Sequence, residues 1–299
     1  LSPAGQQPMF SSDECLCIVF NGEIYNYLVL KAELKQAGCT FRTHTDTEVI
    51  LVAYQHWGTA AFRKFNGMFA FALFDKRINQ LFLVRDVAGI KPLYYSATNK
   101  GLVFASEVKA FYQSGFKCED NHDWKIYFLS FGFIPEPFTT LKNVYQLKPG
   151  YFITYDLKKL TYTETQFESL IFTEEIFDKK EAISKIRYEL NAAVDRHLIS
   201  DAPIGVFLSG GIDSSIITLL AAKNKKQNLK TLSVTFNESD YNEESYQQTI
   251  SEITGSKHKN YRVTQKDYLD AIPTIRNAYD QPSGDAINTW FITRCAKEE

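Results

Sequence analysis

Residues Leu208–Ser215, which read LSGGIDSS, decide the fold of the second half of this chain. They follow the short apolar run Ile204–Leu208 and lead into the helical pattern Ser214–Ala222, so they form a strand-to-helix turn. Two adjacent glycines let the backbone approach an anion closely, and the helix that follows contributes free N–H groups. The stretch therefore predicts a phosphate-binding loop at the carboxyl end of a strand.

The side chains of this loop suit the same chemistry. Ser209 and Ser214 add hydroxyl donors without bulk, and Asp213 offers a carboxylate oxygen to a Mg²⁺ ion that bridges phosphates. The patterns GxxxxGKS/T and GxGxxG are both absent at this position, which excludes a Walker loop and a dinucleotide fingerprint. The alternative is a tight turn in which Gly210 and Gly211 only reverse the chain and the polar side chains cap the helix.

Strand and helix patterns alternate around this loop. A helical run containing Ile183 and Leu198 precedes it; after it, strands are expected at Thr231–Phe236 and Lys259–Val263, and helices at Glu243–Thr254, closed by Gly255, and Asp267–Ala278. Such alternation predicts a parallel sheet with right-handed crossovers. We expect an α/β domain over residues 175–299.

Short strand patterns dominate the first half. The apolar run Cys15–Phe20 is expected to stop at Asn21-Gly22, a common turn pair, while Met68–Phe74 and Gln80–Val84 flank a turn as a hairpin would. Two further strands are expected at Leu102–Ala105 and Tyr151–Tyr155.

Two helices are expected among these strands. Tyr27, Leu30 and Leu34 recur at helical spacing before Gly38, and Asp46 is an expected N-cap of a second helix. The first half is thus an α+β domain with much antiparallel sheet, over residues 1–165. The polar segment Thr161–Lys180 is expected to join it to the second domain.

Bulk composition limits the kind of protein. A length of 299 residues allows about two domains, and 44% hydrophobic with 23% charged residues is typical of a folded soluble protein. A net charge of −2 gives no general attraction to nucleic acid, and no apolar stretch approaches the length of a membrane span. We expect neither nucleic acid nor membrane as a partner.

The cysteines and the chain ends add two expectations. Five cysteines without CxxC spacing argue against a disulfide framework and a zinc site, and they favour reduced thiols in the cytoplasm. The chain begins with Leu1 and ends at Lys297–Glu299 within a helix-like run. We expect a fragment of a longer protein, incomplete at both ends.

The loop Ser209–Ser215 resembles the pyrophosphate-binding loop of the ATP-pyrophosphatase (adenine nucleotide α-hydrolase-like) superfamily, whose members adenylate a carboxylate or carbonyl and release pyrophosphate. The resemblance implies ATP and Mg²⁺ as cofactors, with Asp213 as a Mg²⁺ ligand. It also implies a set of residues that contact ATP: Leu208, Ser209, Gly210, Gly211, Asp213, Ser214 and Val234.

The segments Asn21–Asn26 and Thr45–Val49 resemble the glutamine pocket of class II (N-terminal-nucleophile) amidotransferases of the asparagine synthetase type. Further segments follow in family order: Arg85-Asp86, Gly89–Tyr95, Phe104–Ala110, Ile134–Pro137 and Leu147–Gly150. The resemblance implies an αββα sandwich for the first domain.

The same resemblance assigns roles to four residues. Asn21 and Gly22 would form an oxyanion hole over the scissile amide, and Glu23 and Asp46 would hold the amino acid. The alternative for each fragment alone is structural, since Asn-Gly is a frequent turn and Asp46 an ordinary helix cap.

The implied activity is a ligase reaction. Ammonia from glutamine attacks β-aspartyl-AMP and gives asparagine, glutamate, AMP and pyrophosphate. The partners are then small molecules, namely glutamine, ATP and aspartate or another carboxylate, and a homodimer is left open. The family's nucleophile is an N-terminal cysteine; no residue of this chain fills that role, so no catalytic residue is assigned.

Two departures keep alternatives open. Val87 stands where the family often has arginine, and Gln281 where many members have an acid. These features resemble synthetase-like proteins of surface-polysaccharide gene sets. The acceptor is therefore aspartate or another carboxylate, such as a sugar uronate or a β-lactam precursor, and a non-catalytic paralogue that senses glutamine or nucleotide is a further alternative.

Overall fold

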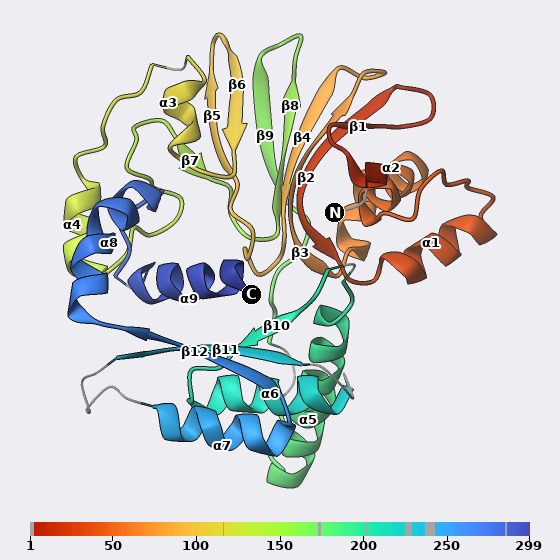
Figure 1. Ribbon diagram of the computed structural model, residues 1–299. Helices are drawn as coiled ribbons and strands as arrows, with labels where there is room; N and C mark the ends of the chain where they lie inside the picture. The colour runs from red at the N-terminus through yellow and green to blue at the C-terminus, as the bar shows by residue number, and fades with distance from the viewer. Residues whose placement is uncertain are drawn as a thin grey trace. The chain divides into compact units, whose positions relative to one another are not determined.

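The computed structural model describes residues 3–115, 117–172, 175–200, 202–224, 229–236, 243–284 and 286–299. The chain divides into two compact units (Figure 1). The first unit is Leu1–Thr173 with Asp280–Pro282, and the second is Glu174–Tyr279 with Ser283–Glu299. Within the described ranges, no helix combines the length and the apolar character that crossing a membrane requires.

Two sheets form the centre of the first unit. The larger has the strand order β1 (Met9–Phe10), β2 (Leu16–Ile24), β3 (Gly67–Asp75), β4 (Gln80–Arg85), β8 (Tyr151–Asp156) and β9 (Thr161–Gln166), all antiparallel. The smaller has the order β6 (Gly101–Ala105), β5 (Tyr94–Thr98) and β7 (Tyr145–Gln146). The helical segments of this unit are α1 (Tyr27–Gln36), α2 (Asp46–Trp57), α3 (Ala110–Gln113), α4 (Trp124–Phe131) and the 3₁₀ turns Pro3–Gly5 and Gly58–Lys64.

The alternation of side chains along β3 explains the layers of this unit. Phe69 and Phe71 face a core shared with α1, α2 and the 3₁₀ turn, where Phe62 is fully buried. Ala70 and Ala72 point the other way, into a second core against the smaller sheet. A third core joins β5 to α3. The layers are helix, sheet, sheet and helix, which confirms the expected αββα sandwich (Figure 1).

Strand β2 corrects one expectation. The apolar run does not stop at Asn21-Gly22, because β2 continues to Ile24 and pairs with β3 through Gly22↔Phe69 and Ile24↔Gly67. Nine residues of β2 pair with β3, and this pairing outweighs the local preference of Asn-Gly for a turn. The hairpin of β3 and β4 is confirmed, with Asp75 opposite Gln80.

The two units divide between Thr173 and Glu174, within the expected segment Thr161–Lys180, but the first residues of that segment belong to a sheet. Thr161–Gln166 forms the edge strand β9, which pairs antiparallel with β8. All six of its residues are exposed, so no buried face marks it as a strand in the sequence. Tyr162 and Glu164 still hold it in place, through an edge-on contact of Tyr162 with the Tyr95 ring and a 2.6 Å hydrogen bond from Tyr95 Oη to Glu164.

The second unit is a parallel three-stranded sheet with helices on both faces. The strands are β10 (Gly205–Phe207), β11 (Lys230–Phe236) and β12 (Lys257–Val263), in that order. The helices are α5 (Lys179–His197), α6 (Ile212–Asn224), α7 (Glu244–Thr254), α8 (Gln265–Ala278) and α9 (Ala286–Glu298). Helix α9 covers one face and helices α6 and α7 the other (Figure 1). The expected α/β fold is confirmed.

Local signals set the ends of these helices. Helix α7 ends at Gly255, which adopts the left-handed conformation. Helix α8 begins with a reciprocal capping box between Thr264 and Asp267. On the α9 side of the sheet, Phe291 is fully buried with Val263 and Ile275.

Candidate functional site

The loop after β10 is closed by hydrogen bonds between its own serines. The N–H of buried Leu208 donates to Leu232 O at 2.8 Å, which extends the sheet to the entrance of the loop. Ser209 N–H donates to Ser214 Oγ at 3.2 Å, and the two hydroxyl oxygens lie 2.8 Å apart. Gly211 N–H donates to Ser209 Oγ at 3.3 Å. The two hydroxyls therefore hold the turn at the N-terminus of α6.

Gly210 is required by the shape of this loop. Its φ is +97°, a backbone conformation that residues with a Cβ rarely adopt. A Cβ built at this position would lie 2.9 Å from Glu243 Cβ. Gln247 on α7 donates from Nε2 to Ser209 O at 3.0 Å and so fixes the loop from outside. Sequence patterns alone do not reveal Gln247, because it lies 38 residues from Ser209.

A cavity of about 500 Å³ opens beside the loop. Leu208, Ser209, Ser214 and Val234 line it, so the structure gathers four of the expected ATP contacts in one place. Gln247 also lines it, and its Oε1 is buried without a hydrogen-bond partner in the described structure. A buried orphan acceptor costs free energy unless a ligand or water satisfies it, so the cavity suits a ligand that presents N–H or O–H groups.

Asp213 lies apart from this lining. It is in the first turn of α6 and exposed, and it is not among the residues that line the cavity. Within the described ranges, no group of three or more His, Cys, Asp or Glu side chains could hold a metal ion. A Mg²⁺ ion at Asp213 would depend on phosphate oxygens for its other ligands, which is the usual way that proteins bind Mg²⁺ with nucleotides.

In the first unit, Asn21 and Glu23 share one exposed face of β2. Asn21 Nδ2 donates to Ser106 Oγ at 3.3 Å, and both residues line a cavity of about 180 Å³. Gln7 lines the same cavity and forms two hydrogen bonds to the backbone of Phe20. The structure thus brings two distant segments, those of Gln7 and Ser106, to the strand that is expected to bind the amide.

Gly22 allows the close pairing of β2 with β3. Its φ is +149°, and a Cβ would lie 2.1 Å from Met68 O and 2.7 Å from Phe69 Cα. No side chain fits in this space, so Gly22 has a structural role in addition to the role that the resemblance implies.

Asp46 does not cap α2. The cap is Thr45, whose side chain accepts a hydrogen bond from Glu48 N–H, and Asp46 is the first helical residue. Asp46 Oδ2 accepts from Ile24 N–H at 3.0 Å, and Oδ1 from Thr47 N–H at 2.8 Å. Ile24 is the last residue of β2 and follows Glu23 in the sequence, so its hydrogen bond to Asp46 places the Asp46 carboxylate beside the end of β2. Burial raises the pKa of Asp46, although the N–H groups partly oppose that rise.

The motif Arg85-Asp86 has a structural role. Buried Arg85 donates to the carbonyls of Gly89, Lys91 and Leu147 and forms a 2.8 Å ion pair with Glu136. The fully buried Asp86 carboxylate accepts hydrogen bonds from four backbone N–H groups, those of Phe69, Ala88, Ile90 and Lys91. Several motifs that carried the family resemblance are therefore held together by this pair.

Comparison with known proteins places the chain in a family. Residues 1–168 match a family model described as a glutamine amidotransferase domain. The chain belongs to this glutamine amidotransferase family. Residues 185–299 match a second family model, described as asparagine synthase.

Relatives that match most of the chain include two glutamine-hydrolyzing asparagine synthetases. Glutamine-hydrolyzing asparagine synthetase 1 of Bacillus subtilis (strain 168) is 37% identical over 98% of this chain and 46% of that protein. Asparagine synthetase 3 of the same organism, also glutamine-hydrolyzing, is 30% identical over 98% of this chain and 51% of that protein. Amidase chry2 of Gibberella zeae is 30% identical over 77% of this chain and 34% of that protein. The chain spans about half the length of the two synthetases.

One solved structure is a more distant match. The glutamine phosphoribosylpyrophosphate amidotransferase of B. subtilis, in complex with ADP and GMP, aligns with a TM-score of 0.42 at 14% identity, over 86% of this chain and 64% of that chain.

Proposed function

We propose that the protein to which this chain belongs transfers ammonia from glutamine to a carboxylate that ATP has activated, and that the carboxylate is the side chain of aspartate. The observation that carries the proposal is the serine-closed loop Ser209–Ser214 beside a cavity of about 500 Å³, in the same chain as an amidotransferase domain. The names of the two synthetases support asparagine as the product.

The loop residues would act on the pyrophosphate end of ATP. An oxygen of the acceptor carboxylate attacks the α-phosphorus, the bond to pyrophosphate breaks, and an acyl-adenylate forms. The N–H groups at the start of α6 and the hydroxyls of Ser209 and Ser214 stabilise the charge that pyrophosphate gains. Bound Mg²⁺, held by phosphate oxygens and Asp213, would neutralise part of the same charge.

The first unit would supply the ammonia. We infer that Asn21 and the N–H of Gly22 polarise the amide of glutamine, while the carboxylates of Glu23 and Asp46 pair with its α-ammonium group. Water hydrolyses this amide to the carboxylate of glutamate and releases ammonia. Ammonia then attacks the acyl carbon of the adenylate, and AMP leaves. We assign none of the five cysteines to the amidase step, and we propose a cytoplasmic location because the structure pairs none of them in a disulfide.

The full-length protein tests this proposal with glutamine labelled with ¹⁵N in its amide group. We expect pyrophosphate release that requires aspartate, with ¹⁵N in the amide of the asparagine formed. Pyrophosphate release with a uronate but not with aspartate would identify a different acceptor. No pyrophosphate release with any carboxylate would contradict ligase activity and favour a sensor.

Asp46→Asn separates binding from folding at the glutamine site. Burial raises the pKa of Asp46. At pH values above that pKa, the ionised carboxylate therefore lowers the stability of the folded protein relative to the unfolded chain. Replacement by asparagine removes this cost. Asparagine also loses one acceptor for the N–H groups of Ile24 and Thr47, so we expect a change in unfolding free energy within about 1 kcal/mol. Glutamine affinity should fall at least about tenfold.

Titration of glutamine into the full-length variant measures the affinity, and urea unfolding measures the stability. The control is Glu33→Gln, which removes an exposed carboxylate of α1 that pairs with Lys64 at 3.0 Å. If Asp46→Asn binds glutamine as tightly as this control, Asp46 does not contact the substrate.

A further inference from the structure

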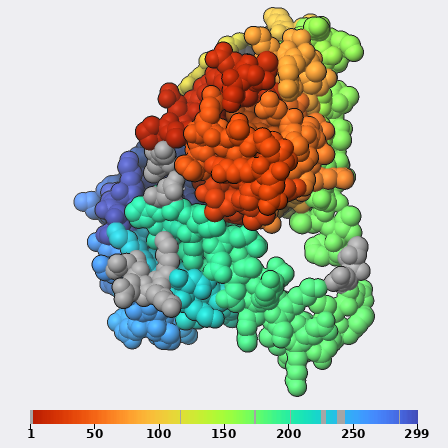
Figure 2. Space-filling view, turned by 90° about the vertical axis from the view of Figure 1, so that its right-hand side faces the viewer, coloured from red at the N-terminus to blue at the C-terminus, as the bar shows by residue number. Residues whose placement is uncertain are grey.

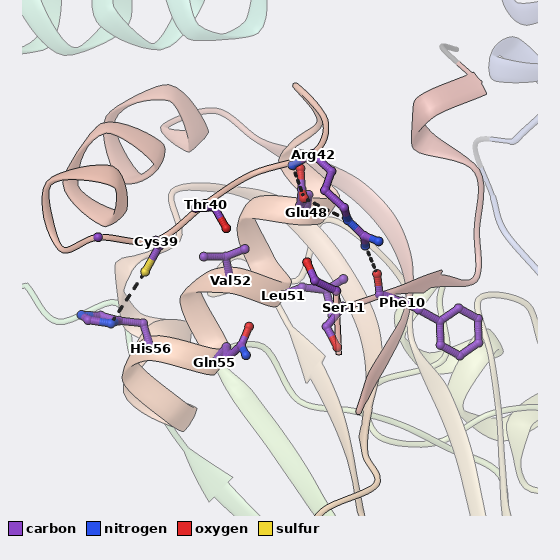
Figure 3. A pocket seen from close by; sticks show the side chains of 12 residues that line it. Phe10, Ser11, Cys39, Thr40, Arg42, Glu48, Leu51, Val52, Gln55 and His56 are labelled. Atoms are coloured by element: carbon purple, nitrogen blue, oxygen red, sulfur yellow. Dashed lines mark hydrogen bonds and ion pairs between the residues drawn. The ribbon is translucent and has the colours of Figure 1, made fainter. Parts of the chain in front are cut away.

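A second cavity of the first unit lies outside the proposed amidase and nucleotide sites. It has a volume of about 300 Å³ and lies between β1, the loop after α1 and helix α2 (Figure 3). Helix α2 and the loop after α1 belong to the helical layer, which is the orange face in Figure 2, and β1 is an edge strand of the larger sheet. None of the residues assigned to glutamine or ATP lines this cavity.

A thiol and an imidazole meet at the edge of this cavity. Cys39 comes from the loop after α1 and His56 from the last turn of α2, and Cys39 Sγ lies 3.9 Å from His56 Nδ1 (Figure 3). The ring of Trp57 packs edge-on against the imidazole, with 5.3 Å between ring centroids.

The loop that carries Cys39 is held firmly. The carboxylate of buried Glu48 accepts from Arg42 N–H at 2.8 Å and from Thr43 N–H at 2.6 Å. Arg42 also donates from Nη2 to Phe10 O at 2.5 Å. These bonds fix the wall of the cavity, so the approach to Cys39 is preformed.

The other cysteines are less suited to reaction. Burial raises the pKa of the thiols of Cys17, Cys118 and Cys295, which lowers the fraction of thiolate at neutral pH. Cys15 is half-buried like Cys39, but in the described part of the chain no hydrogen bond joins its sulfur to a histidine. Cys15 is therefore the internal reference thiol.

We propose that Cys39, paired with His56 beside this cavity, is a reactive thiol that hydroperoxides oxidise to a sulfenic acid. His56 accepts the thiol proton, and the sulfur attacks one oxygen of the peroxide. The S–O bond forms as the O–O bond breaks, and the departing hydroxide, or alkoxide from an organic hydroperoxide, takes the proton from His56 and leaves as water or alcohol. The sulfur loses two electrons and the peroxide gains them, so no other reductant is needed.

Dimedone trapping tests this site in the intact chain. The reduced protein is treated with hydrogen peroxide and dimedone, and mass spectrometry of the digest gives a labelling rate for each cysteine. We expect Cys39 to be labelled first and Cys15 several-fold more slowly. In His56→Asn the rate at Cys39 should fall at least about tenfold, because the proton acceptor is lost.

His44→Asn is the matched control, since it removes an exposed histidine outside the cavity and should leave the Cys39 rate unchanged. His56→Gln repeats the test if His56→Asn melts at a lower temperature than the unmodified chain. Equal labelling of Cys39 and Cys15 in the unmodified chain would overturn the proposal. An unchanged Cys39 rate in a folded His56 variant would overturn the role of the histidine.

Discussion

Replacing Gly22 by alanine is expected to lower the unfolding free energy of the first unit by about 3–5 kcal/mol. The added Cβ would lie 2.1 Å from Met68 O, and the backbone at φ +149° does not suit a residue with a side chain. Both atoms that it meets first belong to the backbone of β3, so no side chain can rotate away. Relief requires β2 and β3 to separate where Gly22 pairs with Phe69.

Gly38→Ala is the matched control for this change. Gly38 also has a positive φ, +86°, but a Cβ there would meet nothing within 4 Å. Backbone strain alone should cost about 1 kcal/mol. Urea unfolding followed by fluorescence of Trp57 and Trp124, in a Trp290→Phe background, reports on the first unit. Equal losses in the two glycine variants would show that the close pairing at Gly22 is not the cause.

The second large effect is expected in ATP affinity. Gly210→Ala should weaken ATP binding at least about tenfold, because the Cβ would lie 2.9 Å from Glu243 Cβ and 3.1 Å from Glu243 O. The loop must then move away from α7, and the 2.8 Å hydrogen bond between the hydroxyls of Ser209 and Ser214 is lost. Isothermal titration of ATP with Mg²⁺ measures the change.

Gly255→Ala controls for backbone strain in the same unit. Gly255 has a φ of +62°, and a Cβ there would meet nothing within 4 Å. It lies at the end of α7, outside the residues that line the nucleotide cavity. This variant should lose some stability and keep its ATP affinity. Equal affinities of the Gly210 and Gly255 variants would mean that the loop does not contact the nucleotide.

Local patterns in the sequence predict the fold where strands carry clear alternation. The hairpin of β3 and β4 and the parallel order of β10, β11 and β12 follow from apolar periodicity and from strand–helix alternation. Asn21-Gly22 was wrongly expected to end a strand, because pairing with a distant strand outweighs local turn preference. The sequence pattern does not predict strand β9, because none of its residues is buried and no apolar alternation marks it.

In the candidate site too, local sequence predicts some features, whereas others depend on residues far apart in the chain. The composition of Ser209–Ser214 predicts a phosphate-binding loop, since its glycines and hydroxyls act within a few residues of one another. Gln247 and Ser106 could not be predicted, because they reach Ser209 and Asn21 from 38 and 85 residues away. Asp46 was expected as a helix cap or a substrate ligand, and only its bond to Ile24 N–H places it beside β2.

The central claim is that the cavity beside Ser209–Ser214 takes an adenine nucleotide. Calorimetric titration of ATP with Mg²⁺ into the unmodified chain tests it most directly, with GTP as the comparison. We expect saturable binding of one ATP per chain, which Gly210→Ala weakens and Gly255→Ala preserves. A folded chain that shows no saturable binding of ATP up to about 1 mM, or that binds GTP equally well, would contradict the claim.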